Sequence, residues 1–149
     1  MRQGRAPFLC AAMGAPDTVE GRFELLTLHV ILLIDRLGGR SQISQSLFDA
    51  YLADLDGALR EMAVGDLSVG KRMRALGQAF YGRSKAWAEA LAGLPDIDPI
   101  ATVLARTVFE GRSNADPLAL ADYVVRCRRS LAAQDDARLR RGEIDWPQA

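Results

Sequence analysis

The residues from Gly65 to Lys71 present the most conspicuous chemical pattern in the chain. Gly65-x-x-x-x-Gly70-Lys71 has the spacing of the front part of a phosphate-binding loop. That loop continues with a Ser or Thr that ligates magnesium, and Arg72 stands in this position. The loop also follows a β-strand, whereas the residues before Gly65 have helical spacing. We therefore interpret the segment as a corner between two helices.

His29 is the only histidine, and it lies in the most apolar stretch of the chain. It could serve a nucleophile–His–carboxylate site only if distant residues supplied its partners; the other interpretation is a core or interface histidine with a satisfied hydrogen bond. No second histidine or cysteine cluster completes a zinc site. Cys10 and Cys127 are far apart, as expected for unpaired thiols in a reducing compartment. We expect no metal, no cofactor and no enzymatic activity.

A basic cluster opens a helix expected from Ser68 to Ala92: Lys71, Arg72 and Arg74. Positive charge at a helix N-terminus has the wrong sign for the helix dipole, so stability alone does not explain the cluster and a partner is expected. Phe80 falls on the inward stripe of this helix, whereas Tyr81 is rotated off it.

The C-terminal helix carries a second basic face, formed by Arg126, Arg128, Arg129, Arg138, Arg140 and Arg141. As a solvated helix exterior this face needs no special explanation, but it suits nucleic-acid phosphates or acidic lipid as well. The chain has 19 basic and 19 acidic residues, so its net charge of zero gives no bulk attraction to polyanions.

The first strong element is a helix over residues 19–37. Asp17 and Glu20 have the spacing of a capping box, and Gly38-Gly39 supplies a left-handed stop. Apolar residues cover nearly its whole circumference, so it should lie centrally and be buried on most sides. Its longest apolar run is too short for a bilayer, which takes about 20 residues. Without a signal-peptide pattern at the N-terminus, we expect a soluble, cytosol-facing protein.

The remaining pattern predicts four more helices, over residues 44–63, 68–92, 98–110 and 117–142, and no strand. Gly70, Gly77 and Gly82 interrupt the 68–92 helix, and close approach of a neighbouring helix should offset their cost. We predict an all-α fold: one domain of about five helices around the apolar first helix. Residues 1–16 form a remnant and connector, 17–142 the helical domain, and 143–149 a tail whose Trp146 is either docked or loose.

Several motifs in order resemble the ubiquinol–cytochrome c chaperone family. The resemblance extends from about Arg5 to Leu91. The motifs are Gly21-Arg-Phe-Glu24, Leu28-His-Val30, Leu47-Phe-Asp49, Asp56-Gly-Ala-Leu-Arg-Glu-Met62, Val64-Gly-Asp66, Val69-Gly-Lys-Arg-Met73 and Ala79-Phe-Tyr-Gly-Arg83. Family members usually carry more chain before the segment like Arg5-Ala-Pro-Phe-Leu, so an N-terminal helix is expected to be missing here.

The resemblance implies an all-helical, non-enzymatic assembly factor for respiratory complex III that binds newly made cytochrome b or another complex III subunit. It also implies a small partner subunit and docking near the ribosomal tunnel exit. We expect peripheral membrane contact, no specific DNA binding, and a place in the cytoplasm, at the inner face of its membrane, or on the matrix side in a mitochondrion. The turn, the 68–92 helix and the first helix should supply the client contacts, through Glu24, His29, Asp66, Val69, Lys71, Arg72, Met73, Phe80, Tyr81 and Arg83.

Two other function classes compete with the chaperone. A helical nucleic-acid-binding protein would use the Arg-rich C-terminal helix and lose affinity steeply with salt. A hydrolase or haem-handling enzyme would require His29 to line a cleft beside a perturbed partner.

Overall fold

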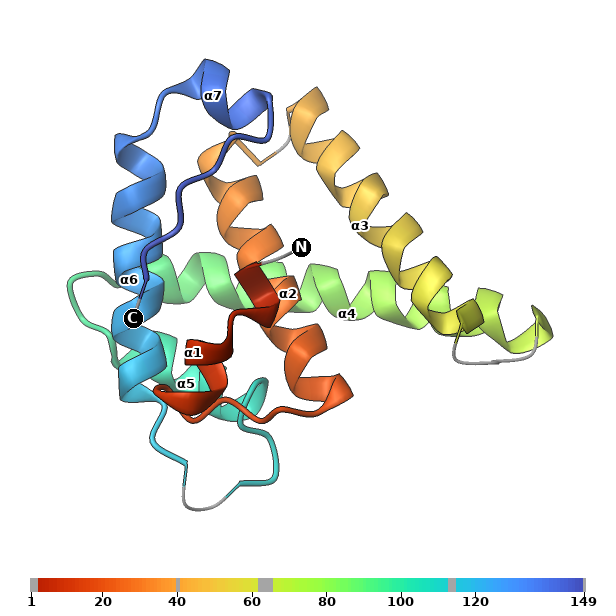
Figure 1. Ribbon diagram of the computed structural model, residues 1–149, viewed down its shortest axis with the longest axis horizontal. Coiled ribbons are helices and arrows are strands. Elements are labelled where there is room, and N and C mark those ends of the chain that lie inside the picture. The colour runs from red at the N-terminus through yellow and green to blue at the C-terminus, as the bar shows by residue number, and fades with distance from the viewer. Residues whose placement is uncertain (1–2, 40, 62–65, 113–114, 149) are drawn as a thin grey trace.

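The chain packs around α2 (Val19–Arg36), as Figure 1 shows. A computed structural model describes residues 3–39, 41–61, 66–112 and 115–148, and every regular element in these ranges is helical. α2 contacts η1 (Gln3–Arg5), α3 (Gln42–Glu61), α4 (Asp66–Ala92) and α6 (Leu118–Ala133). The all-α prediction and the central place of the first helix are confirmed.

Capping residues define both ends of α2. The Thr18 hydroxyl caps the N-terminus by accepting from the Gly21 N–H at 3.1 Å. The predicted capping box at Asp17 is wrong, because the Asp17 carboxylate accepts instead from Arg22 Nε at 2.7 Å. At the other end Gly38 and Gly39 have positive φ angles of 87° and 57°, which confirms the predicted glycine stop.

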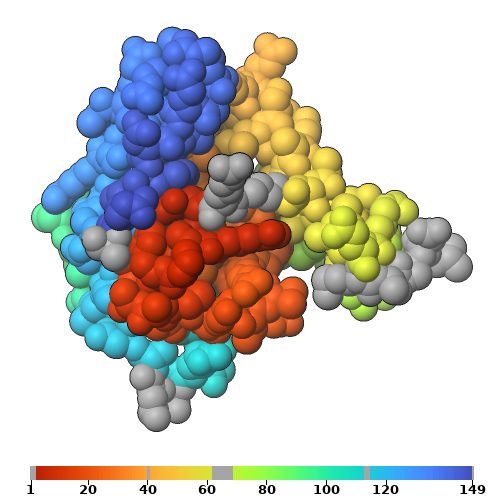
Figure 2. Space-filling model, in the orientation of Figure 1, coloured from red at the N-terminus to blue at the C-terminus, as the bar shows by residue number. Residues whose placement is uncertain are grey.

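The two longest helices, α3 and α4, run out from the body and approach each other at the end of the molecule opposite α6 (Figure 1). We call α3 and residues 66–82 of α4 the arm; it stands out from the body in Figure 2. At a rise of 1.5 Å per residue, α4 is about 40 Å long. The predicted helices over 44–63 and 68–92 agree with α3 and α4 to within two residues where both are described. The predicted stop at Gly65 lies outside the described residues.

The glycines of α4 do not serve the role predicted for them. A Cβ atom built on Gly70, Gly77 or Gly82 would meet no other atom within 4 Å. No described part of the chain therefore approaches α4 closely at these positions, and the expected internal helix contact is wrong. The helix retains the cost of these glycines, roughly 1 kcal/mol each, and keeps an open face.

The predicted fifth helix is two helices, α6 and α7 (Asp136–Arg140). Gln134 leaves α6 in an extended conformation, with ψ 146°, and the Asp135 carboxylate caps α7 by accepting from the Arg138 N–H at 3.1 Å. Arg36 covers the end of α6, because it donates to the carbonyls of Leu131 at 2.8 Å and Gln134 at 3.0 Å. The predicted inward residues of α6 are all buried: Leu120, Ala121, Val124, Val125 and Leu131.

Both ends of the described chain pack on the body. η1 lies against α2, and Leu9 of α1 (Pro7–Ala11) is fully buried. Beyond α5 (Asp98–Arg106), which stops before the predicted Gly111, the chain turns into α6. The tail after α7 runs back along α6 (Figure 1). None of the described helices is both long and apolar enough to cross a membrane. The domain boundaries at residues 16 and 142 stay a prediction.

Candidate functional site

An aromatic cluster joins the two helices of the arm and reaches the surface at one residue. The ring centroids of Phe48 and Phe80 are 4.8 Å apart, and those of Tyr51 and Phe80 are 5.3 Å apart. These rings are buried, whereas Tyr81 is 64% exposed with its centroid 5.6 Å from that of Phe48. The cluster therefore begins in the core and ends in an aromatic side chain open to solvent.

A buried hydrogen bond fixes the inner end of this cluster to α2. The hydroxyls of Tyr51 and Thr27 lie 2.8 Å apart. Because Thr27 uses its one proton to donate to the Phe23 carbonyl at 2.8 Å, Tyr51 is the donor between the two. Burial raises the pKa of Tyr51, so its hydroxyl keeps the proton that it donates.

An ion pair between Glu24 and Arg83 clamps α2 to α4. Arg83 donates to both carboxylate oxygens, with Nε 2.8 Å from Oε2, and its guanidinium lies 5.7 Å from the centre of the Phe23 ring. The hydrogen bonds with Glu24 raise the pKa of Arg83. Two of the predicted client contacts are thus brought together, largely buried, and satisfy each other.

The predicted basic cluster is exposed. Lys71, Arg72 and Arg74 all lie on the surface of α4, and none of them forms an ion pair with any residue that the structure describes. The sequence has no acidic residue between Asp66 and Glu89 to neutralise them. Their charge remains available to a partner.

The other predicted contacts differ in accessibility. Val69 and Phe80 are buried, and Met73 is half-buried. Asp66 begins α4, but its side chain lies outside the described part of the structure. Among the described side chains of the predicted set, Lys71, Arg72 and Tyr81 are the exposed ones.

His29 belongs to a buried chain of hydrogen bonds. Its Nδ1 lies 2.6 Å from the Leu25 carbonyl, which only accepts, so Nδ1 carries the proton. Its Nε2, 3.0 Å from the Tyr123 hydroxyl, then accepts from it, and Tyr123 accepts in turn from Gln3 Nε2 at 2.8 Å. Burial lowers the pKa of His29 to about 4, so the ring is neutral at physiological pH. The structure thus confirms the interpretation of His29 as a core histidine with a satisfied hydrogen bond.

His29 is packed between described side chains and is 3% exposed. Trp146 covers the imidazole edge-on, with ring centroids 4.8 Å apart, so the tail is docked rather than loose. Burial raises the pKa of the nearby Cys127 to about 12, which leaves an unreactive thiol. No group of three or more His, Cys, Asp or Glu side chains among the described residues could hold a metal ion. The packed histidine removes the basis for an enzyme centred on it.

Carboxylates neutralise most of the second basic face. Four of its six arginines form ion pairs: Arg126 with Asp122, Arg128 with Asp35, Arg138 with Glu143 and Asp145, and Arg141 with Glu143. A nucleic-acid interface needs a row of cations free to meet phosphates. The arginines of α6 and α7 do not form such a row.

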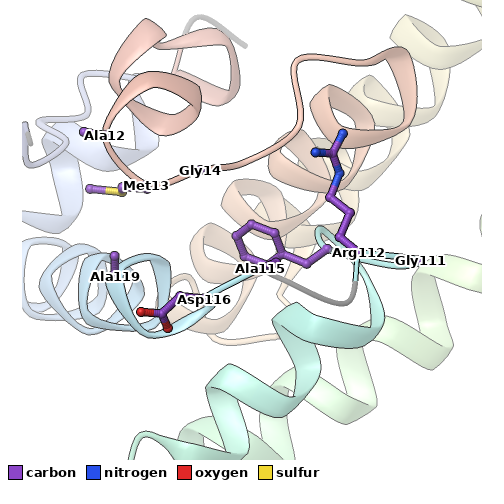
Figure 3. A pocket seen from close by; sticks show the side chains of 9 residues that line it. Ala12, Met13, Gly14, Gly111, Arg112, Ala115, Asp116 and Ala119 are labelled. Atoms are coloured by element: carbon purple, nitrogen blue, oxygen red, sulfur yellow. The ribbon is translucent and has the colours of Figure 1, made fainter.

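Two hollows open elsewhere on the body. The first, of about 600 Å³, lies between the residues after α1 and the chain that leads into α6; Figure 3 shows Met13, Asp116 and Ala119 at one side of it and Arg112 at the other. The second, of about 720 Å³, lies between the end of α2, residues 94–97 and α6. Neither is lined by a predicted client contact.

Sequence reasoning missed two contacts between distant elements: the hydrogen bond of Thr27 with Tyr51 behind the aromatic cluster, and the covering of His29 by Tyr123 and Trp146. Tyr51 lies on the apolar stripe of its helix, so its burial was predictable, but its hydrogen bond to Thr27 joins separate helices. No spacing within one helix signals such a pair.

Comparison with known proteins gives one family and one solved structure. The family model for the ubiquinol–cytochrome c chaperone matches residues 11–146. The crystal structure of the Cbp3 homolog from Brucella abortus has a TM-score of 0.84 and 33% sequence identity, over 99% of this chain and 83% of that one. No curated protein matches the sequence.

Proposed function

Because the chain belongs to the ubiquinol–cytochrome c chaperone family, we propose that it is a non-catalytic assembly factor that binds newly made cytochrome b. The family assignment makes its role that of a chaperone for ubiquinol–cytochrome c reductase. Cytochrome b as the client, and the arm as the surface that holds it, are the proposal.

The observation that carries this proposal is the exposed Tyr81 at the end of a buried aromatic cluster. An exposed aromatic normally loses rotamer freedom when it is bound, but Tyr81 already rests against Phe48, with ring centroids 5.6 Å apart. Both arm helices also carry half-buried apolar side chains, among them Leu52 of α3 and Met73 and Leu76 of α4. Met and Leu side chains repack readily, as a surface for an apolar helix requires.

The direct test replaces Tyr81 with serine in the native host and measures cytochrome b and assembled complex III. Aromatic residues at the centre of an interface typically contribute 1–2 kcal/mol or more, so Tyr81→Ser should lower binding roughly tenfold and reduce cytochrome b accumulation. Chaperone abundance should not change, because the side chain is mostly exposed.

Two matched controls come from the same chain. Val19 and Leu118 are the other large hydrophobic residues that are exposed in the described structure, and both lie outside the arm. Val19→Ser and Leu118→Ser should leave cytochrome b unchanged. Normal cytochrome b in Tyr81→Ser cells with normal chaperone levels would refute the placement of the client.

The remaining partners are tested separately. We propose a small partner subunit and contact with the region of the ribosomal tunnel exit, as the family resemblance implies. Affinity capture of the wild-type chaperone from its native host, with identification of what co-purifies, should recover complex III subunits and this partner. Recovery of neither, from cells that are assembling complex III, would argue against the proposal.

A further inference from the structure

The solvent side of α4 presents one continuous surface along half of the helix. Lys71, Arg74, Gln78, Gly82 and Lys85 follow one another at spacings of three and four residues, which places them on one side of the helix, and all are exposed. We call these five residues the α4 outer face. It points away from the buried stripe that contains Phe80 and Trp87.

Two of the three charges of the α4 outer face have no acidic partner among the described residues. Lys71 and Arg74 form no ion pair with any described residue. Lys85 lies 4.0 Å from Glu89, but both side chains are more than two-thirds exposed, and such a pair contributes little. Within the described structure, most arginines of α6 and α7 have an acidic partner, whereas Lys85 is the one cation of the α4 outer face that has one. Three cations therefore project together toward solvent.

The exposed residues between these cations are mostly small or polar. Gly82 has no side chain, and a Cβ built on it would meet nothing within 4 Å. Ala75 and Gln78 complete the exposed positions between Arg74 and Tyr81, which is 64% exposed at the edge of the face. The face thus combines long, flexible cations with one amphipathic aromatic side chain at its edge.

We infer that the α4 outer face rests on the surface of a membrane that contains anionic phospholipid. Lysine and arginine meet lipid phosphates there, and tyrosine favours the level of the headgroups. Single-stranded nucleic acid is instead held in grooves where several aromatic side chains stack with bases, and this face has one aromatic at its edge.

The expected binding is weak and reversible. Each basic residue near an anionic surface strengthens partition roughly fivefold, so three give roughly a hundredfold over a neutral bilayer. One such signal does not anchor a protein stably. The chaperone would therefore bind the membrane transiently, and would stay bound only while a second contact, such as one with a membrane-embedded client, holds it there. The inference goes beyond the client surface: it shares Tyr81 with that surface, but its charges come from the α4 outer face.

The test measures co-sedimentation of the full chain with two kinds of vesicle, phosphatidylcholine alone and phosphatidylcholine with about one-third phosphatidylglycerol. Wild-type protein should bind the anionic vesicles roughly a hundredfold better and lose this preference in about 1 M salt, where charges are screened beyond about 3 Å. The variant K71Q/R74Q/K85Q should bind both kinds alike.

The matched control is R112Q/R129Q/R140Q, which has the same net charge but removes exposed arginines outside α4. It should keep wild-type binding. The inference is overturned if wild-type protein does not prefer anionic vesicles, if both triple variants lose binding equally, or if RNA added at equal phosphate concentration displaces the vesicles completely. Neither triple variant changes Tyr81. A negative result in the vesicle experiment would therefore refute the membrane contact and leave the test of the client surface by Tyr81→Ser independent.

Discussion

His29 should make the free energy of unfolding decrease as the pH is lowered from about 6.5 to about 4. The pKa of His29 is about 4 in the folded protein and 6.5 in its ordinary state. The unfolded chain therefore takes up a proton below pH 6.5, which the folded protein does not bind until the pH falls to about 4. The stabilisation is complete above pH 6.5 and is lost as the pH falls toward 4. At about 1.4 kcal/mol per pKa unit, the loss is about 3 kcal/mol.

Urea unfolding of wild type and His29→Gln at several pH values between 7 and 4 tests this expectation. Carboxylates titrate in both proteins and cancel in the comparison, and no other histidine contributes. The free energy of unfolding should drop by about 3 kcal/mol more in wild type than in the variant between pH 7 and 4.

Equal pH dependence in the two proteins would refute this account of His29. Should the variant not fold, the ring protons of the wild-type histidine provide the same information, because their NMR shifts should stay at the neutral value at pH 6 and 5.5. A midpoint near 6.5 would contradict the buried, neutral ring.

Two further predictions concern the stability of the fold. Gly21→Ala should destabilise the protein by about 2 kcal/mol in urea unfolding, because the new Cβ would lie 2.2 Å from the Pro16 carbonyl oxygen. Gly77→Ala should stabilise it by about 1 kcal/mol, because the new Cβ would meet nothing within 4 Å; the opposite order would contradict the open face of α4. Thr27→Val and Tyr51→Phe should each lower the free energy of unfolding by about 1–2 kcal/mol, and the double variant should lower it by about 1 kcal/mol less than their sum. If the two effects are strictly additive, the hydrogen bond of 2.8 Å between the two hydroxyls contributes nothing to stability.

The helices could be predicted where their signals are local. The glycine stop at Gly38-Gly39 lies next to the residues that it ends, so α2 was predicted nearly to the residue. The break between α6 and α7 has no glycine or proline to mark it, and depends on the Asp135 cap and on Arg36 from a distant helix. The residues next to the break therefore do not indicate it, because a contact with a distant helix leaves no pattern in the local sequence.

The candidate site was predictable only in part for the same reason. Helical spacing placed Phe80 inward and Tyr81 outward, and both positions are confirmed. Glu24 and Arg83 were selected as contacts for a client, but their charges are used on each other across two helices. Spacing gives the face of a residue on its own helix, and it cannot tell whether another element of the chain covers that face.

The hydrogen-bonded chain through His29 also sets an order of events during synthesis. α2 leaves the ribosome early, but the hydroxyl that satisfies His29 belongs to Tyr123, 94 residues later, and the ring that seals it belongs to Trp146. Contacts so distant in sequence close late in folding. For most of its own translation, the chain therefore carries its most apolar helix without the side chains that cover His29 in the folded protein.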